Sequence, residues 1–292
     1  MTSAERSDNA FMGWMRGNLT RAATRFGLTI TGDATFGWRL RSITAPARDP
    51  QGRPRWLRVT TEQSRWLDAA REMWDGNLDA NAITGVPKPR VLDLAEWEAP
   101  DQHRHVHAET MTALPGQPSS PTSILRRPLT LPDTWWHHLR QSLDHLRTVP
   151  TTRRDGITIA TRRVREVLDV DLTIQRVETA HGDLHWANLL TPQLGILDWE
   201  LWGLAPAGTD AATLYCTSLL EPTMATRVWH HFNDILDTPD GQCALLTVAA
   251  RLLRRTTLGD HPDLAAPLNT LTTQLLAQRG SPKPSTGRWT AR

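Results

Sequence analysis

The segment from His181 to Glu200 holds the side chains of this sequence that are best placed to do chemistry. Asp183 follows a strand-like apolar run, Asn188 comes five residues later, and Asp198 follows the apolar run 195–197. Two carboxylates and an amide at the ends of short strands can converge on one point. Mg²⁺ takes oxygen ligands and commonly keeps one or two protein groups beside phosphate oxygens. One carboxylate then remains to accept a proton from an attacking hydroxyl.

Two other interpretations of these residues exist. Asp183-Leu184-His185 fits the D-x-H start of a binuclear metallophosphoesterase, but that class also needs a downstream Gly-Asn-His, which the sequence lacks. A polar loop with capping Asx residues would explain single positions. It does not explain five defined positions at two fixed separations.

The loop resembles that of the aminoglycoside phosphotransferase family, small-molecule kinases that share the protein-kinase fold. The H-G-D start of the family loop is matched at 181–183, its Asn at 188, and its D-W-E at 198–200. The resemblance implies that Asp183 is the catalytic base and that Asn188 and Asp198 ligate Mg²⁺. It also implies that His185 faces the transferred phosphoryl group, that His181 braces the loop, and that ATP or GTP is the co-substrate.

The family's phosphate-binding Lys on the third strand has no counterpart here. The sequence has 31 Arg but only two Lys, and the first Lys is at position 88. Arg58, a cation between apolar neighbours in a strand-like run, is the candidate substitute, because a guanidinium binds phosphate bidentately. Glu72, or less well placed Glu62, is the expected helical partner of Arg58.

Two further segments are expected to bind the nucleotide. The segment 32–37, with Gly32, Thr35 and Gly37, permits close backbone approach to phosphates, although it is no G-x-G-x-x-G. The segment 107–116 resembles the passage on which adenine rests in the family. There Met111 would border the adenine, and the backbone of Thr112 and Leu114 would hydrogen-bond it.

The pattern of elements predicts the α+β class with two lobes, and the family resemblance implies that these lobes form a bilobal protein-kinase-like fold. We expect a β-rich nucleotide-binding N-lobe over 1–114, a Pro-rich linker over 115–132, and a mainly helical C-lobe over 133–292 that carries the catalytic loop and acceptor site. Within the N-lobe, strands are expected around 38–43, 56–59, 91–97 and 105–114, with a helix over 61–75. In the C-lobe, helices are expected at 133–147, 162–168 and within 209–280, whereas 1–25 shows only scattered apolar positions.

Composition excludes several classes of protein. With 292 residues, 39% hydrophobic content and a net charge of +2, the chain can bury a substantial core, and nothing favours nucleic-acid binding. No run is apolar enough for a membrane span, so we expect a cytoplasmic protein. Cys216 and Cys243 are expected to be buried thiols. The family resemblance implies that Asp210 braces the catalytic loop. His103, His105 and His107 alternate, and the solvent face of a hairpin is the favoured interpretation.

The predicted function is phosphoryl transfer from ATP or GTP to a hydroxyl of an antibiotic-like acceptor, such as an aminoglycoside, nucleoside or sugar-containing molecule. Two alternatives remain open: a pseudokinase that binds nucleotide with little catalysis, and a metabolite kinase of the choline or homoserine kind. A monomer or a homodimer is expected.

Overall fold

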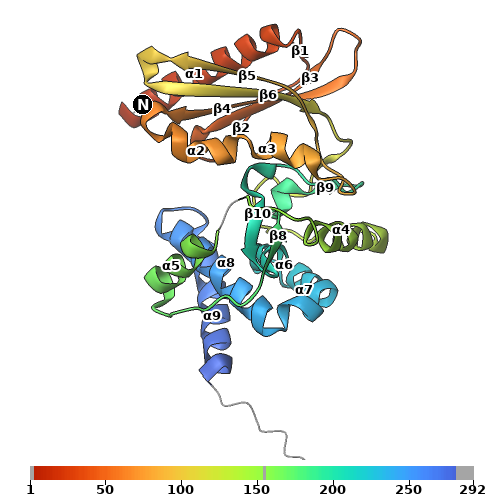
Figure 1. The fold of residues 1–292 in the computed structure, drawn as a ribbon, viewed down its shortest axis with the longest axis vertical. Coiled ribbons are helices and arrows are strands. Elements are labelled where there is room, and N and C mark those ends of the chain that lie inside the picture. The colour runs from red at the N-terminus through yellow and green to blue at the C-terminus, as the bar shows by residue number, and fades with distance from the viewer. Residues whose placement is uncertain (1–2, 154–155, 281–292) are drawn as a thin grey trace, which may run out of the picture. The chain divides into compact units, whose positions relative to one another are not determined.

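The computed structural model describes residues 3–153 and 156–280 (Figure 1). The chain forms two compact units that are interleaved in sequence. Unit 1 comprises 1–119, 131–154 and 188–202, and unit 2 comprises 120–130, 155–187 and 203–292. The units therefore do not follow the linear division predicted at 114 and 132. The segments 131–154 and 188–202 make most of their contacts with the N-terminal sheet unit rather than with the helices that follow in sequence.

Unit 1 is built on one antiparallel sheet with the order β1-β3-β4-β6-β5, in which β2 also pairs with β3. The strands are β1 (Thr29–Ile30), β2 (Thr35–Phe36), β3 (Ser42–Arg48), β4 (Pro54–Gln63), β5 (Val91–Ala99) and β6 (Arg104–Thr112). The central pair β4 and β6 is in register over nine residues, with Arg58 opposite Glu109. Successive side chains of a strand point to opposite faces, so this register decides which residues meet on each face.

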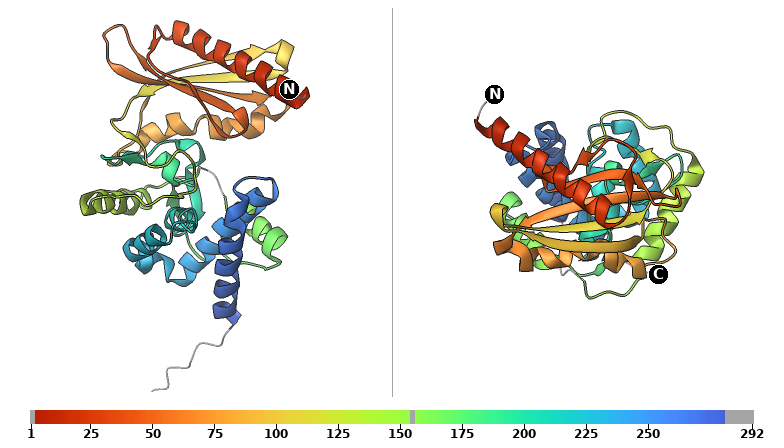
Figure 2. Two further views of the ribbon diagram at one scale, coloured as in Figure 1. Left: turned by 180° about the vertical axis from the view of Figure 1, so that it is seen from behind. Right: turned by 90° about the horizontal axis from the view of Figure 1, so that it is seen from above.

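The helix α1 (Ser3–Arg25) covers one face of this sheet, and Figure 2 shows it running across the strands. Met15, Leu19 and Ala22 pack against sheet residues such as Ile43 and Leu57 to form the buried core of this unit. No element was predicted here. The apolar residues do recur at helical spacing, but Gly13 and Gly17 interrupt the pattern, and interior glycines are unfavourable in helices.

Two short helices, α2 (Leu67–Trp74) and α3 (Gly76–Asp79), lie on the opposite face of the sheet. The predicted helix over 61–75 begins later than expected, because β4 continues to Gln63 and a 3-10 turn follows. Trp74 stacks near the His107 ring at 5.4 Å, and Asn77 Nδ2 donates to Glu109 Oε2 at 2.9 Å. This face is therefore lined by polar side chains, whereas the α1 face is apolar.

The hairpin turn between the first strands lies at 37–41 and not within the predicted loop 32–37. Thr35 belongs to β2, and Gly32 lies in the short break between β1 and β2, both of which pair with β3. Gly37 begins the turn and donates its N–H to the Ser42 carbonyl at 2.9 Å. Arg39 and Leu40 adopt left-handed φ values of 51° and 60°, a conformation that their residue types do not signal.

The remaining segments of unit 1 come after the sheet in the sequence. Gly116 has φ 106°, and a Cβ there would lie 2.5 Å from the Thr191 carbonyl oxygen, so only glycine fits this close approach. The strand β7 (Gln117–Pro118) pairs with β9 (Leu190–Thr191), and Trp135 of α4 (Asp133–Leu146) donates its indole N–H to the Leu190 carbonyl at 2.9 Å. The helix predicted at 133–147 is confirmed.

Unit 2 is mainly helical. It contains α5 (Ile157–Leu168), α6 (Thr209–Cys216), α7 (Pro222–Leu236), α8 (Pro239–Thr257), α9 (Ala265–Gly280) and one hairpin made of β8 (Val177–Ala180) and β10 (Gly203–Pro206). The long helix α8 packs against α5, α6, α7 and α9, and its residues from Ala244 to Ala250 are buried.

The α+β class, with an antiparallel-sheet unit and a helical unit, is confirmed. Both cysteines are buried free thiols, as expected. Among the residues described, no helix is long and apolar enough to cross a membrane.

Candidate active site

The loop that carries Asp183 is held by Asp210, at the start of α6. Asp210 Oδ2 accepts the backbone N–H of His181 at 2.8 Å, and its Oδ1 accepts that of Gly182 at 3.0 Å. Gly182 has φ 81°, which a glycine adopts without strain. Burial raises the pKa of Asp210, against the lowering effect of these hydrogen bonds. The predicted bracing role of Asp210 is confirmed.

Asp183 is surrounded by cationic and basic groups of unit 2. His185 Nε2 lies 3.4 Å from Oδ2 of Asp183, and Arg251 Nη2 lies 3.7 Å from Oδ1. Burial alone would raise the pKa of Asp183, but the charges of His185, Arg251 and His181 outweigh it and hold that pKa well below its usual range. The carboxylate is therefore ionised at any physiological pH.

Arg251 of α8 was not predicted from the sequence. Its Nη1 donates to the Gly182 carbonyl at 2.6 Å, and its Nη2 donates to Thr213 Oγ1 at 3.1 Å. These contacts fix the position of a permanent cation next to Asp183. Sixty-eight residues separate the two in the sequence, and no local pattern marks Arg251 among the other arginines.

In unit 1, a short hairpin holds Asn188 and Asp198 side by side. Leu197 donates its N–H to the Asn188 carbonyl at 2.8 Å, and Leu190 donates to the Gly195 carbonyl at 2.9 Å. Asp198 itself has φ 63° and ψ 69°, a left-handed conformation that is uncommon outside glycine and that concentrates at functional sites. The hairpin therefore brings an amide and a carboxylate to the same end, as the sequence predicted.

This donor set fits Mg²⁺ held together with a polyphosphate. Amide and carboxylate oxygens are the ligands that Mg²⁺ takes, and one or two protein ligands suffice when phosphate oxygens complete the octahedron. The Asp198 side chain is 39% exposed, so it is accessible to a ligand. Within residues 3–153 and 156–280, no cluster of three or more His, Cys, Asp or Glu forms a complete protein metal cage.

Arg58 on β4 forms ion pairs with the segment that follows the hairpin. Its Nη1 lies 3.0 Å from Asp198 Oδ1, and its Nη2 lies 2.5 Å from Glu200 Oε1. Burial alone would lower the pKa of Arg58, but Glu200 and Asp198 raise it above its ordinary value, so the guanidinium stays charged. Burial raises the pKa of Glu200 to about 7, although Arg58 acts in the opposite direction.

The expected pairing of Arg58 with Glu72 is wrong. Both ion pairs of Arg58 go to residues 198 and 200, and the carboxylate opposite it in the sheet is Glu109. Glu72 is in the last turn of α2, and its backbone carbonyl accepts a hydrogen bond from Arg153. The cause is the length of β4: because the strand continues to Gln63, α2 begins four residues after the strand ends, and Glu72 lies on its final turn.

A buried polar network lies next to Arg58 on the same face of the sheet. His107 is 2% exposed, with Nδ1 2.9 Å from Glu96 Oε1 and Nε2 3.2 Å from Glu109 Oε1. Burial would lower the pKa of His107, but the two carboxylates raise it. The expectation that His103, His105 and His107 share a solvent face is therefore wrong, because α2 covers His107 and His103 lies in a turn before the strand.

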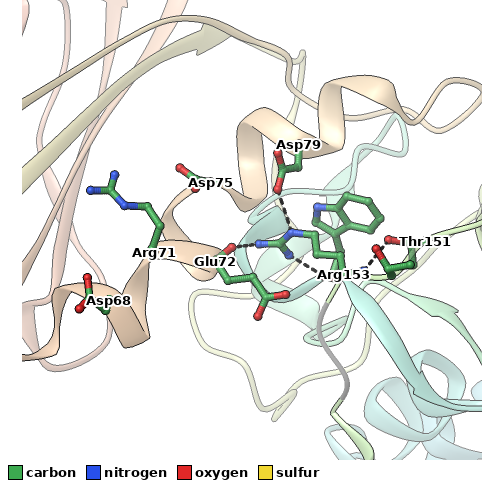
Figure 3. A pocket seen from close by; sticks show the side chains of 9 residues that line it. Asp68, Arg71, Glu72, Asp75, Asp79, Thr151 and Arg153 are labelled. Carbon is green, nitrogen blue, oxygen red and sulfur yellow. Dashed lines mark hydrogen bonds and ion pairs between the residues drawn. The ribbon is translucent and has the colours of Figure 1, made fainter.

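Arg153 joins α2 and α3 to the segment after Asp198. Its guanidinium donates to the carbonyl oxygens of Glu72 and Trp202, the latter at 2.6 Å, and pairs with Asp79 at 3.1 Å (Figure 3). Gly76 allows this close approach, since a Cβ there would lie 2.7 Å from two carbonyl oxygens of that segment. The same residues line a pocket of about 620 Å³ together with further polar side chains: Asp68, Arg71, Asp75, Thr151 and Thr152.

Lys88, the first lysine of the chain, also lies against this segment. It is 7% exposed, and its Nζ lies 5.8 Å from the centroid of the Trp199 ring. Burial, with the charge of Arg90, lowers the pKa of Lys88 to about 8. Lys88 was not predicted as a site residue.

The predicted adenine-binding segment is the end of β6 and the chain beyond it. Met111 is buried, and the Thr112 N–H already donates to the Arg90 carbonyl at 2.9 Å. The Thr112 N–H is thus already engaged within the protein. Leu114 lies beyond the strand, and in the described part of the chain its backbone makes no hydrogen bond.

No protein-family model matches the sequence, and a search of curated proteins also gave no match. Solved structures match it over most of its length. The aminoglycoside phosphotransferase APH(4)-Ia is 11% identical, with a TM-score of 0.57 over 90% of this chain and 98% of that one. The macrolide 2'-phosphotransferase MphH from Brachybacterium faecium is 16% identical, with a TM-score of 0.54 over 87% and 98% of the two chains.

A choline kinase from Cryptosporidium parvum is similar to the same extent, with 11% identity and a TM-score of 0.54 over 87% of this chain and 89% of that one. These neighbours are small-molecule kinases. The chain has the fold of these proteins, so the fold that the motif resemblance implied is confirmed.

Proposed function

We propose that this protein is a kinase that transfers the γ-phosphoryl group of ATP or GTP to a hydroxyl group of a small molecule. The observation that carries the proposal is the hairpin in which the Leu197 N–H bonds the Asn188 carbonyl and sets Asp198 beside Asn188. It supplies two oxygen ligands in a chain with a kinase-like fold.

Asp183 is the proposed catalytic base. Its ionised carboxylate accepts a hydrogen bond from the acceptor hydroxyl and orients the oxygen for in-line attack on the γ-phosphorus. A new O–P bond forms while the bond from the γ-phosphorus to the β,γ-bridging oxygen breaks, and the hydroxyl proton passes to Asp183. The low pKa of Asp183 is compatible with this role, because the transition state of phosphoryl transfer is loose and needs little early proton removal.

Asn188 and Asp198 are the proposed metal ligands, and His185 is proposed to face the transferred phosphoryl group. Mg²⁺, when bound there, would neutralise phosphate charge. Arg58 is proposed to bind the nucleotide phosphates in place of a lysine. It is held within reach of Asp198 by its ion pair, and a guanidinium can bind two phosphate oxygens at once.

The remaining proposed nucleotide contacts come from the end of β6, the chain beyond it and the segment 32–37. Met111 borders the adenine, the backbone of Thr112 and Leu114 bonds its edge, and the early glycine-containing segment with Gly32, Thr35 and Gly37 approaches the phosphates.

An antibiotic-like acceptor is proposed, an aminoglycoside, nucleoside or sugar-containing molecule, with a metabolite of the choline or homoserine kind as the alternative. The structural neighbours carry the names of phosphotransferases for aminoglycosides, macrolides and choline. We propose a cytoplasmic protein, a monomer or homodimer, with no nucleic-acid or membrane partner.

A nucleotide-binding pseudokinase is the second candidate function. Two features favour it. Arg58 stands where the related kinases have a lysine, and it forms an ion pair with Asp198, a proposed metal ligand. In a pseudokinase, ATP or GTP binds and no phosphoryl group is transferred.

The test measures acceptor-dependent release of ADP or GDP with Mg²⁺ over a panel of antibiotics and hydroxyl-bearing metabolites, alongside calorimetry of nucleotide binding. If the protein is a kinase, we expect acceptor-dependent turnover in the wild type. Asn188→Ala, Asp198→Ala and the addition of EDTA should each abolish it. Nucleotide binding without turnover on any acceptor identifies the pseudokinase, and absence of both refutes the proposal.

A further inference from the structure

Four arginines of α5 and α8 lie near one another in unit 2, and one of them, Arg251, contacts Asp183. The two helices pack against each other (Figure 1). Arg254 of α8 pairs with Glu166 of α5 at 3.7 Å. Arg251 lies one turn before Arg254 and contacts Asp183, while Arg163 lies one turn before Glu166. The fourth, Arg162, shares Glu166 with Arg254, at 3.6 Å. A strip of guanidinium groups therefore extends from the catalytic carboxylate along both helices.

Arg163 is the member of this strip whose charge is least compensated. Within the described residues it makes no ion pair, and its Nε is buried without a hydrogen-bond partner. Burial and the neighbouring charges of Arg251 and Arg254 lower the pKa of Arg163, and Glu166 only partly opposes them. By contrast, Arg165 on the same helix is exposed and pairs with Asp171.

Such an arrangement is unfavourable for the protein by itself. Like charges on adjacent helices repel one another, and a buried donor without a partner keeps its full desolvation penalty. Buried polar groups in native proteins are nearly always satisfied by protein, water or a bound group. An anion held between α5 and α8 would satisfy the Arg163 donor and offset the repulsion.

We propose that Arg163, Arg251 and Arg254 bind an anionic group, a carboxylate or a phosphate, of the acceptor molecule. This inference rests on the proposed function, since it identifies the acceptor's chemistry. The acceptor hydroxyl must lie within hydrogen-bond distance of Asp183, and Arg251 contacts that same carboxylate. The acceptor is therefore bound with its hydroxyl at Asp183 and its anionic group along the strip.

An anion site of this kind distinguishes the possible acceptors by their charge. A polycationic aminoglycoside would add positive charge beside three arginines, which disfavours it electrostatically. An acid-bearing sugar, a nucleotide-like molecule or a hydroxy acid would be attracted instead. Guanidinium groups suit this role because they bind carboxylate and phosphate bidentately.

The first experiment measures anion binding directly, without catalysis. The full chain is titrated calorimetrically with inorganic phosphate and, separately, with glucuronate, so that the two sources of anion are distinguished. Saturable binding of at least one probe is expected, with affinity lowered on the order of tenfold to a hundredfold in Arg163→Gln. Arg165→Gln is the matched control and should bind as the wild type does, and Arg163→Lys should restore part of the affinity.

The second experiment compares phosphorylation of a matched set: glucose, glucosamine and glucuronate. The anionic member is expected to have the highest kcat/KM, and Arg163→Gln is expected to raise its KM more than it lowers kcat. A preference for glucosamine overturns the inference, as does failure of both anions to bind or binding that Arg163→Gln leaves unchanged. Arg163-dependent anion binding in a protein that transfers no phosphoryl group would refute the proposed function and leave the anion site standing.

Discussion

Replacing Arg58 by methionine tests whether the two ion pairs of Arg58 stabilise unit 1. The side chain of Arg58 is 8% exposed and its two terminal nitrogens contact separate carboxylates, on Asp198 and Glu200. Methionine keeps much of the volume of the side chain but removes the charge. Both carboxylates then lose their partner, and Glu109 opposite Arg58 in the sheet loses a neighbouring cation.

The expected loss follows from the burial of each pair. Glu200 is 19% exposed, so its pair with Arg58 is largely shielded from water and contributes about 1.5–3 kcal/mol. Asp198 is 39% exposed, and water screens its pair to less than about 1 kcal/mol. We therefore expect Arg58→Met to lower the free energy of unfolding by about 3 kcal/mol. Arg58→Lys, which reaches one carboxylate at a time, should cost about 1–2 kcal/mol.

Urea unfolding at pH 7.5, followed by circular dichroism, measures these differences. Arg41→Met is the matched control, because Arg41 is 41% exposed and its pair with Glu62 should contribute less than about 1 kcal/mol. If Arg58→Met costs no more than Arg41→Met, the two ion pairs of Arg58 do not exist in solution, and its placement beside the proposed metal ligand Asp198 is refuted.

Three further substitutions test individual contacts. Lys88 has a pKa near 8 in the folded chain against 10.5 when unfolded, so stability should rise by up to about 3 kcal/mol between pH 8 and pH 10.5 as the unfolded state retains the proton. Lys88→Met should lack this rise in urea unfolding, and an equal rise in both proteins would contradict the burial of the ammonium. Gly76→Ala should destabilise by about 2 kcal/mol or more, because its Cβ would meet two carbonyl oxygens at 2.7 Å; an unchanged melting temperature would refute that close approach. Asp210→Asn leaves one of two backbone N–H groups facing an amide NH₂, so thermal stability should fall by about 1–3 kcal/mol, whereas a neutral effect would show that Asp210 does not brace the loop.

The local geometry of the proposed catalytic segment could be predicted because its sequence signal is local. Asp183, Asn188 and Asp198 lie within sixteen residues, each next to a short apolar run. The hairpin that places Asn188 beside Asp198 closes over only ten residues, so spacing alone constrains it. The bracing role of Asp210, which lies 28 and 29 positions from the two residues it holds, was predicted from the family resemblance and not from local spacing.

The partners of Arg58 could not be predicted, because they are distant in the sequence. One hundred and forty residues separate Arg58 from Asp198, and the choice of Asp198 and Glu200 over Glu72 depends on where β4 ends. That end is set by pairing with β6, which reaches Gln63. The intrinsic strand and helix propensities of residues 61–66 do not indicate where β4 ends, because pairing with a neighbouring strand overrides local preference.

Two other differences between the predicted and the observed structure have local causes. The turn at 37–41 uses left-handed φ at Arg39 and Leu40, where the residue types give no turn signal. His107 belongs to an alternating strand, and alternation identifies two faces without telling which one a helix will cover. Here α2 covers the polar face, so the histidine and its two glutamates are buried.

The proposed reaction is tested most directly by transfer of a labelled γ-phosphoryl group from ATP or GTP to a hydroxyl-bearing acceptor, followed by identification of the labelled product. We predict one equivalent of phosphorylated acceptor for each nucleoside diphosphate formed with the wild-type chain. Asp183→Asn should lower the rate by a factor of about 10² or more while nucleotide still binds. Label released only as inorganic phosphate, or transfer undiminished in Asp183→Asn, would contradict the assignment of Asp183 as the base of a small-molecule kinase.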